Sequence, residues 1–424
     1  MVKHFRIAFF TPSFLPKCSG AEIFHHNLAS RLVEAGHHVA VILPRRYLHE
    51  LAGLSDKLKY DLIPYPANTW SYFKRSPGFA LLINRLALAR LQRQHRFDLW
   101  HGVVTYPTGV CLINWQEHAA SKGKSTPYLV RSVGDDVLVS GQEVGLRRDS
   151  QVEKLIRGTI PQVRMMIALS ETMRLEYLRI GVPAERLATI PNAVNLARFH
   201  EPTNREETRA LYGLARNGFL FLAVGRNHPQ KDYPTLLDAI LQLRRVHNRP
   251  FQLLIAGRDA HKLEPEVSRR GLQETVRLAD VGVSESLPLT AFTPELPTAA
   301  MIDLYRAADA FVMSSLLEGF SSALLEAMAA ALPVIVTDSP GCAEFVREED
   351  SGLIVPPRDP AKLAQAMAML MEDEQTRKQL SVRASQRAAQ FDWPRVLDRY
   401  LQIYDQLVGT QKPELPSRVG STRQ

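Results

Sequence analysis

Cysteine is scarce in the sequence, since only Cys18, Cys111 and Cys342 occur among 424 residues. No two of them form a Cys-x-x-Cys pair, and an odd number cannot pair off completely in disulfides. Proteins that mature in oxidising compartments use cysteine in even sets at short spacings. The scarcity therefore predicts a reduced environment and a cytoplasmic location.

Long apolar runs and metal-ligand clusters are missing as well. No uninterrupted apolar run approaches the ~18 residues that a membrane span needs, and the run from Ile7 to Phe10 is too short for the core of a signal peptide. We therefore expect a chain that does not cross a membrane. The histidines that stand in adjacent pairs point different ways on a helix or strand, so no metal site is expected.

One long segment lacks acidic residues: neither Asp nor Glu occurs from Leu62 to Phe97. A helix lying on an anionic membrane surface would have this composition, and the net charge of +8 agrees with an anionic partner. An ordinary solvated helix fits equally well, because Leu82 and Leu86 fall among the arginines on a helical wheel. The basic residues of the segment are Lys74, Arg75, Arg85, Arg90, Arg93 and Arg96.

The length and composition suit two globular domains of ~200 residues each, with 45% hydrophobic and 23% charged residues. The first domain opens with an apolar strand at 6–10, a helix at about 21–35 and a second strand at 38–43, which make a βαβ unit. Its turn has a single glycine, Gly20, near the helix start. A dinucleotide fingerprint needs three, so an oxidoreductase is disfavoured.

Further along the first domain, 97–101 and 128–133 are expected strands, and the second runs into Gly134, Asp135 and Asp136. Ligands bind beyond the carboxyl ends of strands in open α/β sheets. Both carboxylates therefore stand where a second substrate would lie. Asp136 either touches that substrate or caps a turn.

The second domain starts with a strand at 219–224, followed by Gly225, Arg226 and Lys231 and then a helix from about Tyr233. Strand, glycine, basic loop and helix together predict an anion site. Arg226 can hold phosphate oxygens at two points, whereas Lys231 supplies a mobile point charge.

The most informative stretch runs from Leu317 to Met328 and predicts a strand end, a tight turn and a helix start. The preceding strand is expected at 310–313, and Ser321 or Ser322 is a natural N-cap. Free N–H groups and the helix dipole favour a diphosphate at that helix start. Glu318, before the turn, and Glu326, inside the helix, are placed to accept hydrogen bonds from hydroxyls. The pattern predicts a ligand that carries both phosphate and sugar.

This Glu-x7-Glu stretch, read with Gly-Arg-x4-Lys from Gly225 to Lys231, resembles the two signatures of the family 4 retaining glycosyltransferases. The resemblance implies the GT-B fold, in which two Rossmann-like doubly wound α/β domains face each other across a cleft. The Pro-Asn-Ala-Val-Asn segment at 191–195 resembles the link between the domains in that family. The implied parts are an acceptor domain at 1–195, a nucleotide-sugar domain at 196–390, a helix crossing back at 391–409 and a disordered tail at 410–424.

The resemblance also implies roles for individual residues. Glu318 would contact the donor sugar, Glu326 the ribose, and Arg226 with Lys231 the diphosphate. Asp136 matches an acceptor-side Asp of the family, but Val133 stands where those enzymes often have His; His101 or His118 could substitute from neighbouring loops. The remaining donor-binding residues would be Gly20, Val283 at the base loop, Gly319, Phe320, Ser321 and Ser322.

The implied activity is transfer of a sugar, with retention, from a nucleoside diphosphate sugar to a glycan or lipid-linked acceptor in cell-envelope polysaccharide or glycolipid synthesis. The donor would be UDP- or GDP-linked, with no cofactor and no essential metal. We expect no nucleic acid as partner and a cytoplasmic enzyme, with peripheral contact to an anionic membrane at its inner surface. The alternatives are a sugar-nucleotide epimerase or hydrolase on the same fold, and a binding subunit without catalysis.

Overall fold

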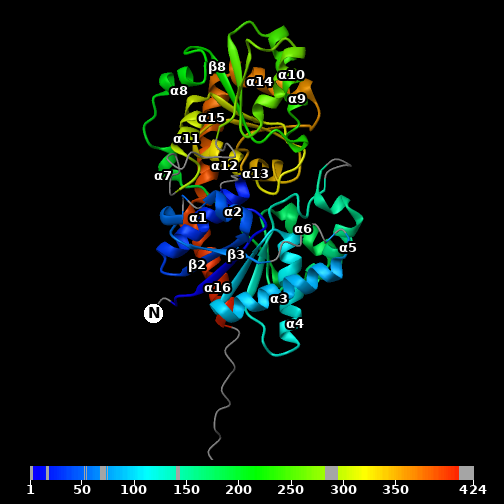
Figure 1. The fold of residues 1–424 in the computed structure, drawn as a ribbon. Helices are drawn as coiled ribbons and strands as arrows, with labels where there is room; N and C mark the ends of the chain where they lie inside the picture. Colours follow the sequence, from blue (N-terminus) through cyan, green and yellow to red (C-terminus); the bar gives the residue numbers. More distant parts are fainter. Residues whose placement is uncertain are drawn as a thin grey trace, which may run out of the picture.

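The computed structural model describes residues 3–15, 19–51, 53, 55–66, 73, 75–139, 144–281 and 295–409. These residues form two α/β lobes, one above the other in Figure 1, each built on a parallel sheet. The segment proposed as a disordered tail, 410–424, lies outside the described residues, as do Cys18 and Val283.

The lower lobe holds a parallel sheet of seven strands in the order β3-β2-β1-β4-β5-β6-β7. Its strands are β1 (Arg6–Phe10), β2 (His38–Pro44), β3 (Asp61–Tyr65), β4 (Leu99–Val103), β5 (Tyr128–Arg131), β6 (Met166–Ala168) and β7 (Leu187–Thr189). The order reverses between β1 and β4, and the carboxyl ends of the strands at such a point form a binding crevice. The expected βαβ start of the chain is present.

Helices cover both faces of this sheet because its strands are apolar on both sides. Ile7 and Phe9 pack in one cluster with α1 (Gly20–Glu34) and α16 (Trp393–Gly409), whereas Ala8 and Phe10 pack in another with α3 (Pro77–His95) and α4 (Val110–Ala120). The helices of this part of the chain are α1 (Gly20–Glu34), α2 (Arg45–Leu51), α3 (Pro77–His95), α4 (Val110–Ala120), α5 (Ser150–Thr159), α6 (Glu171–Ile180) and α7 (Leu196–Phe199); α16 comes from the other end of the chain.

The upper lobe repeats the plan with six parallel strands in the order β10-β9-β8-β11-β12-β13. They are β8 (Phe219–Val224), β9 (Phe251–Ala256), β10 (Val276–Ala279), β11 (Ala310–Met313), β12 (Val334–Thr337) and β13 (Leu353–Val355). The order reverses between β8 and β11, so the carboxyl ends of the strands form a second crevice there. The helices are α8 (Arg205–Leu211), α9 (Tyr233–Val246), α10 (Glu264–Arg269), α11 (Ala299–Ala307), α12 (Ser322–Ala329), α13 (Ala343–Arg347), α14 (Pro360–Glu372), α15 (Glu374–Ala388) and α16 (Trp393–Gly409).

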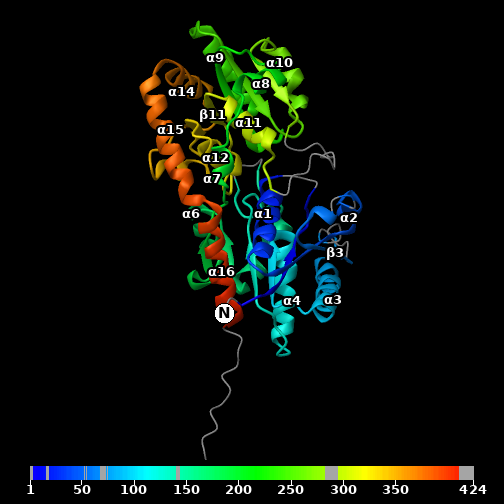
Figure 2. The ribbon, with the colours of Figure 1, turned by 90° about the vertical axis from the view of Figure 1, so that its left-hand side faces the viewer.

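The last helix, α16, lies on the lower lobe, and in Figure 2 it continues the line of α15 from one lobe to the other. Its Trp393, Tyr400 and Tyr404 are buried in a first-domain cluster. The Tyr404 hydroxyl lies 2.7 Å from Nδ1 of His101, and the Tyr400 hydroxyl accepts a 2.8 Å hydrogen bond from Nε of Arg131. The end of the chain thus completes the core of its beginning.

The described residues of the acid-free segment include most of the edge strand β3 and all of the helix α3. Three large apolar side chains on α3 are exposed: Phe79 at 50%, Leu82 at 41% and Leu86 at 60%. Arg90 and Arg93 are exposed on the same helix. At helical spacing these five positions share one outward stripe, which we call the α3 stripe.

Candidate active site

The two crevices enclose one cleft of about 490 Å³. Its walls come from loops that follow β1, β4 and β5 in the lower lobe, and β8, β9 and β11 in the upper lobe. This is where open α/β sheets bind ligands. Predicted site residues that line the cleft are Gly20, Asp136, Arg226, Lys231, Glu318, Phe320, Ser321, Ser322 and Glu326.

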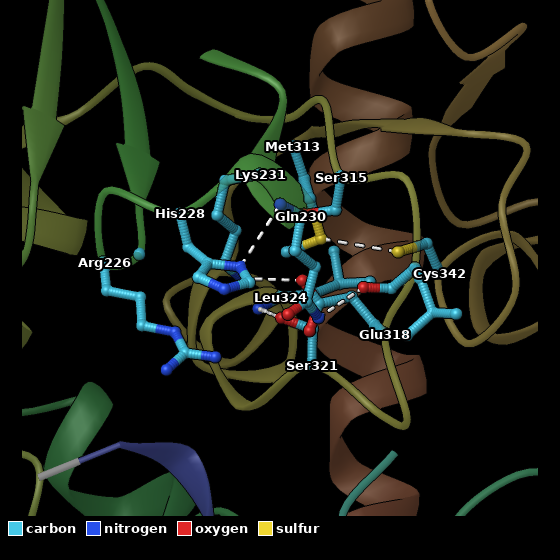
Figure 3. Close-up of polar contacts among 12 residues, drawn as sticks. Arg226, His228, Gln230, Lys231, Met313, Ser315, Glu318, Ser321, Leu324 and Cys342 are labelled. Carbon is cyan, nitrogen blue, oxygen red and sulfur yellow. Dashed lines mark hydrogen bonds and ion pairs between the residues drawn. The ribbon is translucent and has the colours of Figure 1, made fainter. Parts of the chain in front are cut away.

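A buried ion pair forms the upper wall of the cleft. Lys231 Nζ donates a 2.6 Å hydrogen bond to Oε1 of Glu318, whose side chain is only 11% exposed. Figure 3 shows this pair between the two loops that carry it. Gly225 allows the arrangement, because a Cβ there would stand 2.7 Å from Cε of Lys231.

Gln230 fixes the spacing of the same two loops, and the sequence did not single it out. Its Nε2 donates a 2.5 Å hydrogen bond to the Leu317 carbonyl, and Ser314 Oγ donates to the Lys231 carbonyl at 2.7 Å. A lysine and a glutamate that lie far apart in the chain are therefore held at one position in the cleft.

Arg226 stands apart from that pair and points toward the lower lobe (Figure 3). One terminal nitrogen of its guanidinium lies 4.0 Å from Oδ2 of Asp135, and both side chains are about one third exposed, at 34% and 36%. Burial, followed by the nearby Asp136 carboxylate, raises the pKa of Asp135 to about 6, although Arg226 opposes the shift. The cleft thus contains a second, looser pair of charges that bridges the domains.

The turn before α12 brings the two domains into backbone contact. A Cβ on Gly319 would stand 2.6 Å from the Val133 carbonyl and from Cα of Gly134, so only glycine permits the approach. Helix α12 starts at the Ser321 cap, whose Oγ accepts a 3.3 Å hydrogen bond from the Leu324 N–H. Gly319 is therefore a contact between domains, in addition to the donor role implied for it.

Asn192 links the helix start to the lower lobe. Its Nδ2 donates to the Phe320 carbonyl at 2.8 Å and to Ser322 Oγ at 3.0 Å. Gly20, at the start of α1, faces the same serine, since a Cβ there would stand 3.0 Å from Ser322 Oγ. The N-termini of α1 and α12 therefore meet at the cleft, and the positive ends of their helix dipoles favour an anion there.

Glu326 lies deeper, inside α12, with only 9% of the residue exposed. Tyr305 donates a 2.8 Å hydrogen bond from its hydroxyl to Oε2 of Glu326. Burial raises the pKa of this carboxyl to about 7, even though the Tyr305 bond and the charge of Arg198 lower it. A ligand hydroxyl that donates to Glu326 would favour its charged form.

Asp136 connects the loops after β4 and β5 through hydrogen bonds to its carboxylate. Asp136 is only 1% exposed. Its carboxylate accepts four hydrogen bonds, from Thr105 N at 2.5 Å, Ser132 Oγ at 2.6 Å, Val133 N at 3.1 Å and Gly134 N at 2.9 Å. The carboxylate oxygens therefore face the turn, which corresponds to the turn-capping alternative. The neighbouring Asp135 carries the side chain that is open to the cleft.

The histidines considered as substitutes for Val133 are placed elsewhere. His101 is fully buried on β4, and His118 lies on α4; neither lines the cleft formed by the described residues. Val133 itself does line it. Val283, expected at the nucleotide base, lies outside the described residues, while Arg258, after β9, lines the cleft and was not singled out.

Comparison with known proteins identifies two adjacent matches along the chain. Residues 18–198 match the family described as Glycosyltransferase Family 4, and residues 204–387 match Glycosyl transferases group 1. The D-inositol 3-phosphate glycosyltransferase of Nocardia farcinica is 27% identical over 291 residues, which is 68% of this chain. The match spans 57% of the relative's own length.

Solved structures share the whole fold at low identity. A glycosyltransferase from Rickettsia africae has a TM-score of 0.74 and 18% identity, with 96% of this chain and 99% of the other covered. Anabaena HepE, solved with UDP and glucose, has a TM-score of 0.70 and 19% identity, with 95% and 100% covered. Within the described part of this chain, no helix has the length and apolar character needed to span a bilayer.

Proposed function

The chain belongs to the group 1, family 4 glycosyltransferases and has their GT-B fold, and we propose that it moves a sugar from a nucleoside diphosphate sugar to a glycan or lipid-linked acceptor with retention at the anomeric carbon. The observation that carries this proposal is the buried Lys231–Glu318 pair, set beside Arg226 and the start of α12 in the cleft between the domains. Cations and carboxylates at one place suit a ligand with both phosphate and hydroxyl groups.

The donor's diphosphate is proposed to lie against Arg226, Lys231 and the N-terminus of α12. Two cationic side chains and the free N–H groups of a helix start neutralise the charge that builds on the departing diphosphate, which is the main electrostatic requirement of the reaction. Arg226 is available for this role because its existing partner, Asp135, is 4.0 Å away and both side chains are partly exposed.

The sugar and ribose are proposed to bind the two glutamates. Glu318 has one carboxylate oxygen on Lys231, so a sugar hydroxyl can donate to the other while Lys231 is held beside the phosphate. Glu326 is placed deeper, where the ribose hydroxyls would replace water as hydrogen-bond donors. HepE, which shares the fold, was solved with UDP and glucose; a uridine nucleotide is therefore the first donor to test.

In the proposed reaction the bond between the anomeric carbon and the phosphate oxygen breaks as the acceptor oxygen attacks from the same face. The acceptor's proton passes to the departing phosphate oxygen, and the diphosphate leaves with its charge held by Arg226 and Lys231. No carboxylate is required as a nucleophile. Because these protein groups neutralise the leaving group, the proposal includes no essential metal.

The α3 stripe supports a peripheral membrane contact for a lipid-linked or envelope acceptor. Phe79, Leu82 and Leu86 are exposed beside Arg90 and Arg93 on the domain that would hold the acceptor. Apolar side chains that enter the headgroup region, flanked by arginines, bind anionic lipid surfaces, with about 1 kcal/mol contributed per basic residue near the surface.

Two alternatives to a transferase are an epimerase or hydrolase that acts on the nucleotide sugar, and a donor-binding subunit without catalysis. Val133, in the position where the family often has His, favours the binding subunit. Incubation with a panel of nucleotide sugars separates them. A transferase releases nucleoside diphosphate only with an acceptor, a hydrolase releases it without one, an epimerase forms the epimeric sugar nucleotide, and a binding subunit gives no turnover.

A further inference from the structure

One wall of the cleft lies apart from the residues that would hold the donor. This wall consists of the loops that follow β4 and β5 in the lower lobe, and the side chains that line the cleft from it include Val104, Tyr106, Val133, Asp135 and Leu146. We call these five residues the lower wall. They line the cleft from the lower lobe, whereas the Lys231–Glu318 pair lines it from the upper lobe. The second substrate of a transfer reaction would enter on this side.

The first loop of the lower wall has an unusual backbone. Val104 has φ of 65°, a left-handed conformation that is rare for a β-branched residue. Such conformations persist where surrounding contacts enforce them, and they concentrate at ligand sites. Here the Asp136 carboxylate holds the next residue, through the Thr105 N–H at 2.5 Å, and the Thr105 hydroxyl lies 2.6 Å from the Tyr177 hydroxyl.

This restraint determines where Tyr106 lies. The loop after β4 and the loop after β5 are tied by one buried carboxylate, since Asp136 also accepts from Val133 N and Gly134 N. Tyr106 packs edge-on against Phe73, with ring centroids 5.7 Å apart, and presents part of its surface to the cleft. The aromatic ring and the Asp135 carboxylate are therefore held on two loops of fixed separation.

The lower wall has little positive charge. Among the described residues of the lower lobe that line the cleft, the basic one is Arg131, which is fully buried. Arg131 is already occupied by Tyr400, at 2.8 Å, and by the Asn192 side-chain oxygen, at 2.5 Å. The wall instead has the partly exposed carboxylate of Asp135, an aromatic ring and the side chain of Leu146, which is 44% exposed.

We propose that Tyr106, Leu146 and Asp135 form an acceptor subsite that takes an uncharged sugar ring, with Tyr106 and Leu146 against its apolar face and Asp135 accepting a hydrogen bond from one of its hydroxyls. The inference rests on the proposed transferase function and deepens it. A phosphorylated acceptor would place an anion beside the Asp135 carboxylate, where like charges repel. A sugar ring has the C–H face and the hydroxyl donors that these side chains require.

Asp135 also links the two substrates. In the free protein it faces Arg226 at 4.0 Å. A diphosphate is the stronger partner for the guanidinium, because phosphate and arginine form short, doubly hydrogen-bonded contacts. Donor binding would thus release Asp135 for the acceptor. Removing the Asp135 charge should then weaken acceptor binding and leave diphosphate binding equal or tighter, a split that general damage to the site would not produce.

The test compares the parent protein with Asp135→Asn, Tyr106→Leu and the control Asp398→Asn, an exposed position on α16. Binding of methyl glucoside and of glucose 6-phosphate is measured by saturation-transfer NMR in the presence of saturating UDP, and UDP binding is titrated separately. Thermal melts verify that each variant is folded.

We expect methyl glucoside to bind the parent and glucose 6-phosphate to bind at least about tenfold more weakly. Asp135→Asn and Tyr106→Leu should each weaken methyl glucoside about tenfold or more, the usual effect of losing a charged hydrogen bond or an aromatic contact. UDP affinity should stay within about twofold of the parent or become tighter in Asp135→Asn, because no acid then competes for Arg226.

Preference for glucose 6-phosphate, or equal losses of UDP and sugar binding in Asp135→Asn, would overturn the subsite. Absence of UDP binding by the parent would instead contradict the donor site, and with it the proposed function. The two failures are therefore distinguishable.

Discussion

Replacing Glu326 by glutamine should stabilise the free protein and weaken donor binding. The residue is 9% exposed and its carboxyl has one described hydrogen bond, from the Tyr305 hydroxyl at 2.8 Å, so its ionised form is poorly solvated. A glutamine has nearly the same shape, can accept the same bond through its amide oxygen, and cannot ionise.

The magnitude follows from the pKa of Glu326, which burial raises from 4.5 to about 7. The unfolded chain gives up this proton at lower pH than the folded one, so the group's contribution to stability is fully present below about 4.5 and is lost as pH rises through about 7. A difference of about 2.5 pKa units corresponds to about 3 kcal/mol at pH 8. Glu326→Gln avoids that loss.

The assay is urea unfolding of parent and Glu326→Gln at pH 5 and pH 8, with Glu185→Gln, at an exposed position, as control. We expect a gain of up to about 3 kcal/mol at pH 8 that shrinks to a small fraction at pH 5. UDP binding at pH 8 should weaken by about 1 kcal/mol or more, because a charged acceptor is replaced by a neutral one. Equal stability of the two proteins at pH 8, or a gain that does not change with pH, would refute the reasoning.

Further predictions concern the ion pair, the α3 stripe and the buried histidines. Lys231→Met should weaken UDP binding and lower turnover, because its partner is the phosphate; unchanged UDP affinity in a titration would contradict this. Glu318→Gln should lower turnover while UDP binds as tightly as before or more tightly, since Lys231 loses its competing anion; steady-state kinetics with full turnover would remove the assigned role. Leu86→Asp should reduce sedimentation with anionic vesicles at low salt, whereas equal partition of the parent to neutral and anionic vesicles would dismiss the contact. Burial lowers the pKa of His25 and His101 well below 6.5, so their contribution to stability should fall as pH drops below about 6.5; because Glu326 and Asp135 act in the opposite sense, the test uses a variant with both Glu326→Gln and Asp135→Asn, in which a flat urea midpoint from pH 7.5 to 5.5 would contradict the burial of these histidines as neutral rings.

The upper half of the site could be predicted because its chemistry is contiguous in the chain. The strand β11, the turn at Gly319 and the cap at Ser321 follow one another, and all three lie where local rules place them. Arg226 and Lys231 likewise follow β8 directly. Local rules could not predict the pairing of Lys231 with Glu318. That pairing arises because β8 and β11, the strands before the two loops, are neighbours in the sheet.

The lower half depended on contacts between distant residues. Asp135 and Asp136 are adjacent, and the N–H of Thr105, on another loop, is among the donors that turn Asp136 inward and leave its neighbour in the cleft. His101 is buried against Tyr404 on the last helix, and no feature of the sequence near His101 predicts that contact. The strand β3 was missed because Pro64 interrupts its pattern; as an edge strand it tolerates the missing N–H.

The most direct test of the central claim is the stereochemical outcome of transfer by the parent protein. Nucleotide sugars of the UDP and GDP series, of defined anomeric configuration, are incubated with methyl glucoside and with a lipid-linked sugar, and the product's anomeric signal is read by NMR beside the amount of free diphosphate. We expect diphosphate release that depends on acceptor, a product with the donor's anomeric configuration, and loss of both in Glu318→Gln. Inverted product, release without acceptor, or an epimerised sugar nucleotide would contradict this expectation.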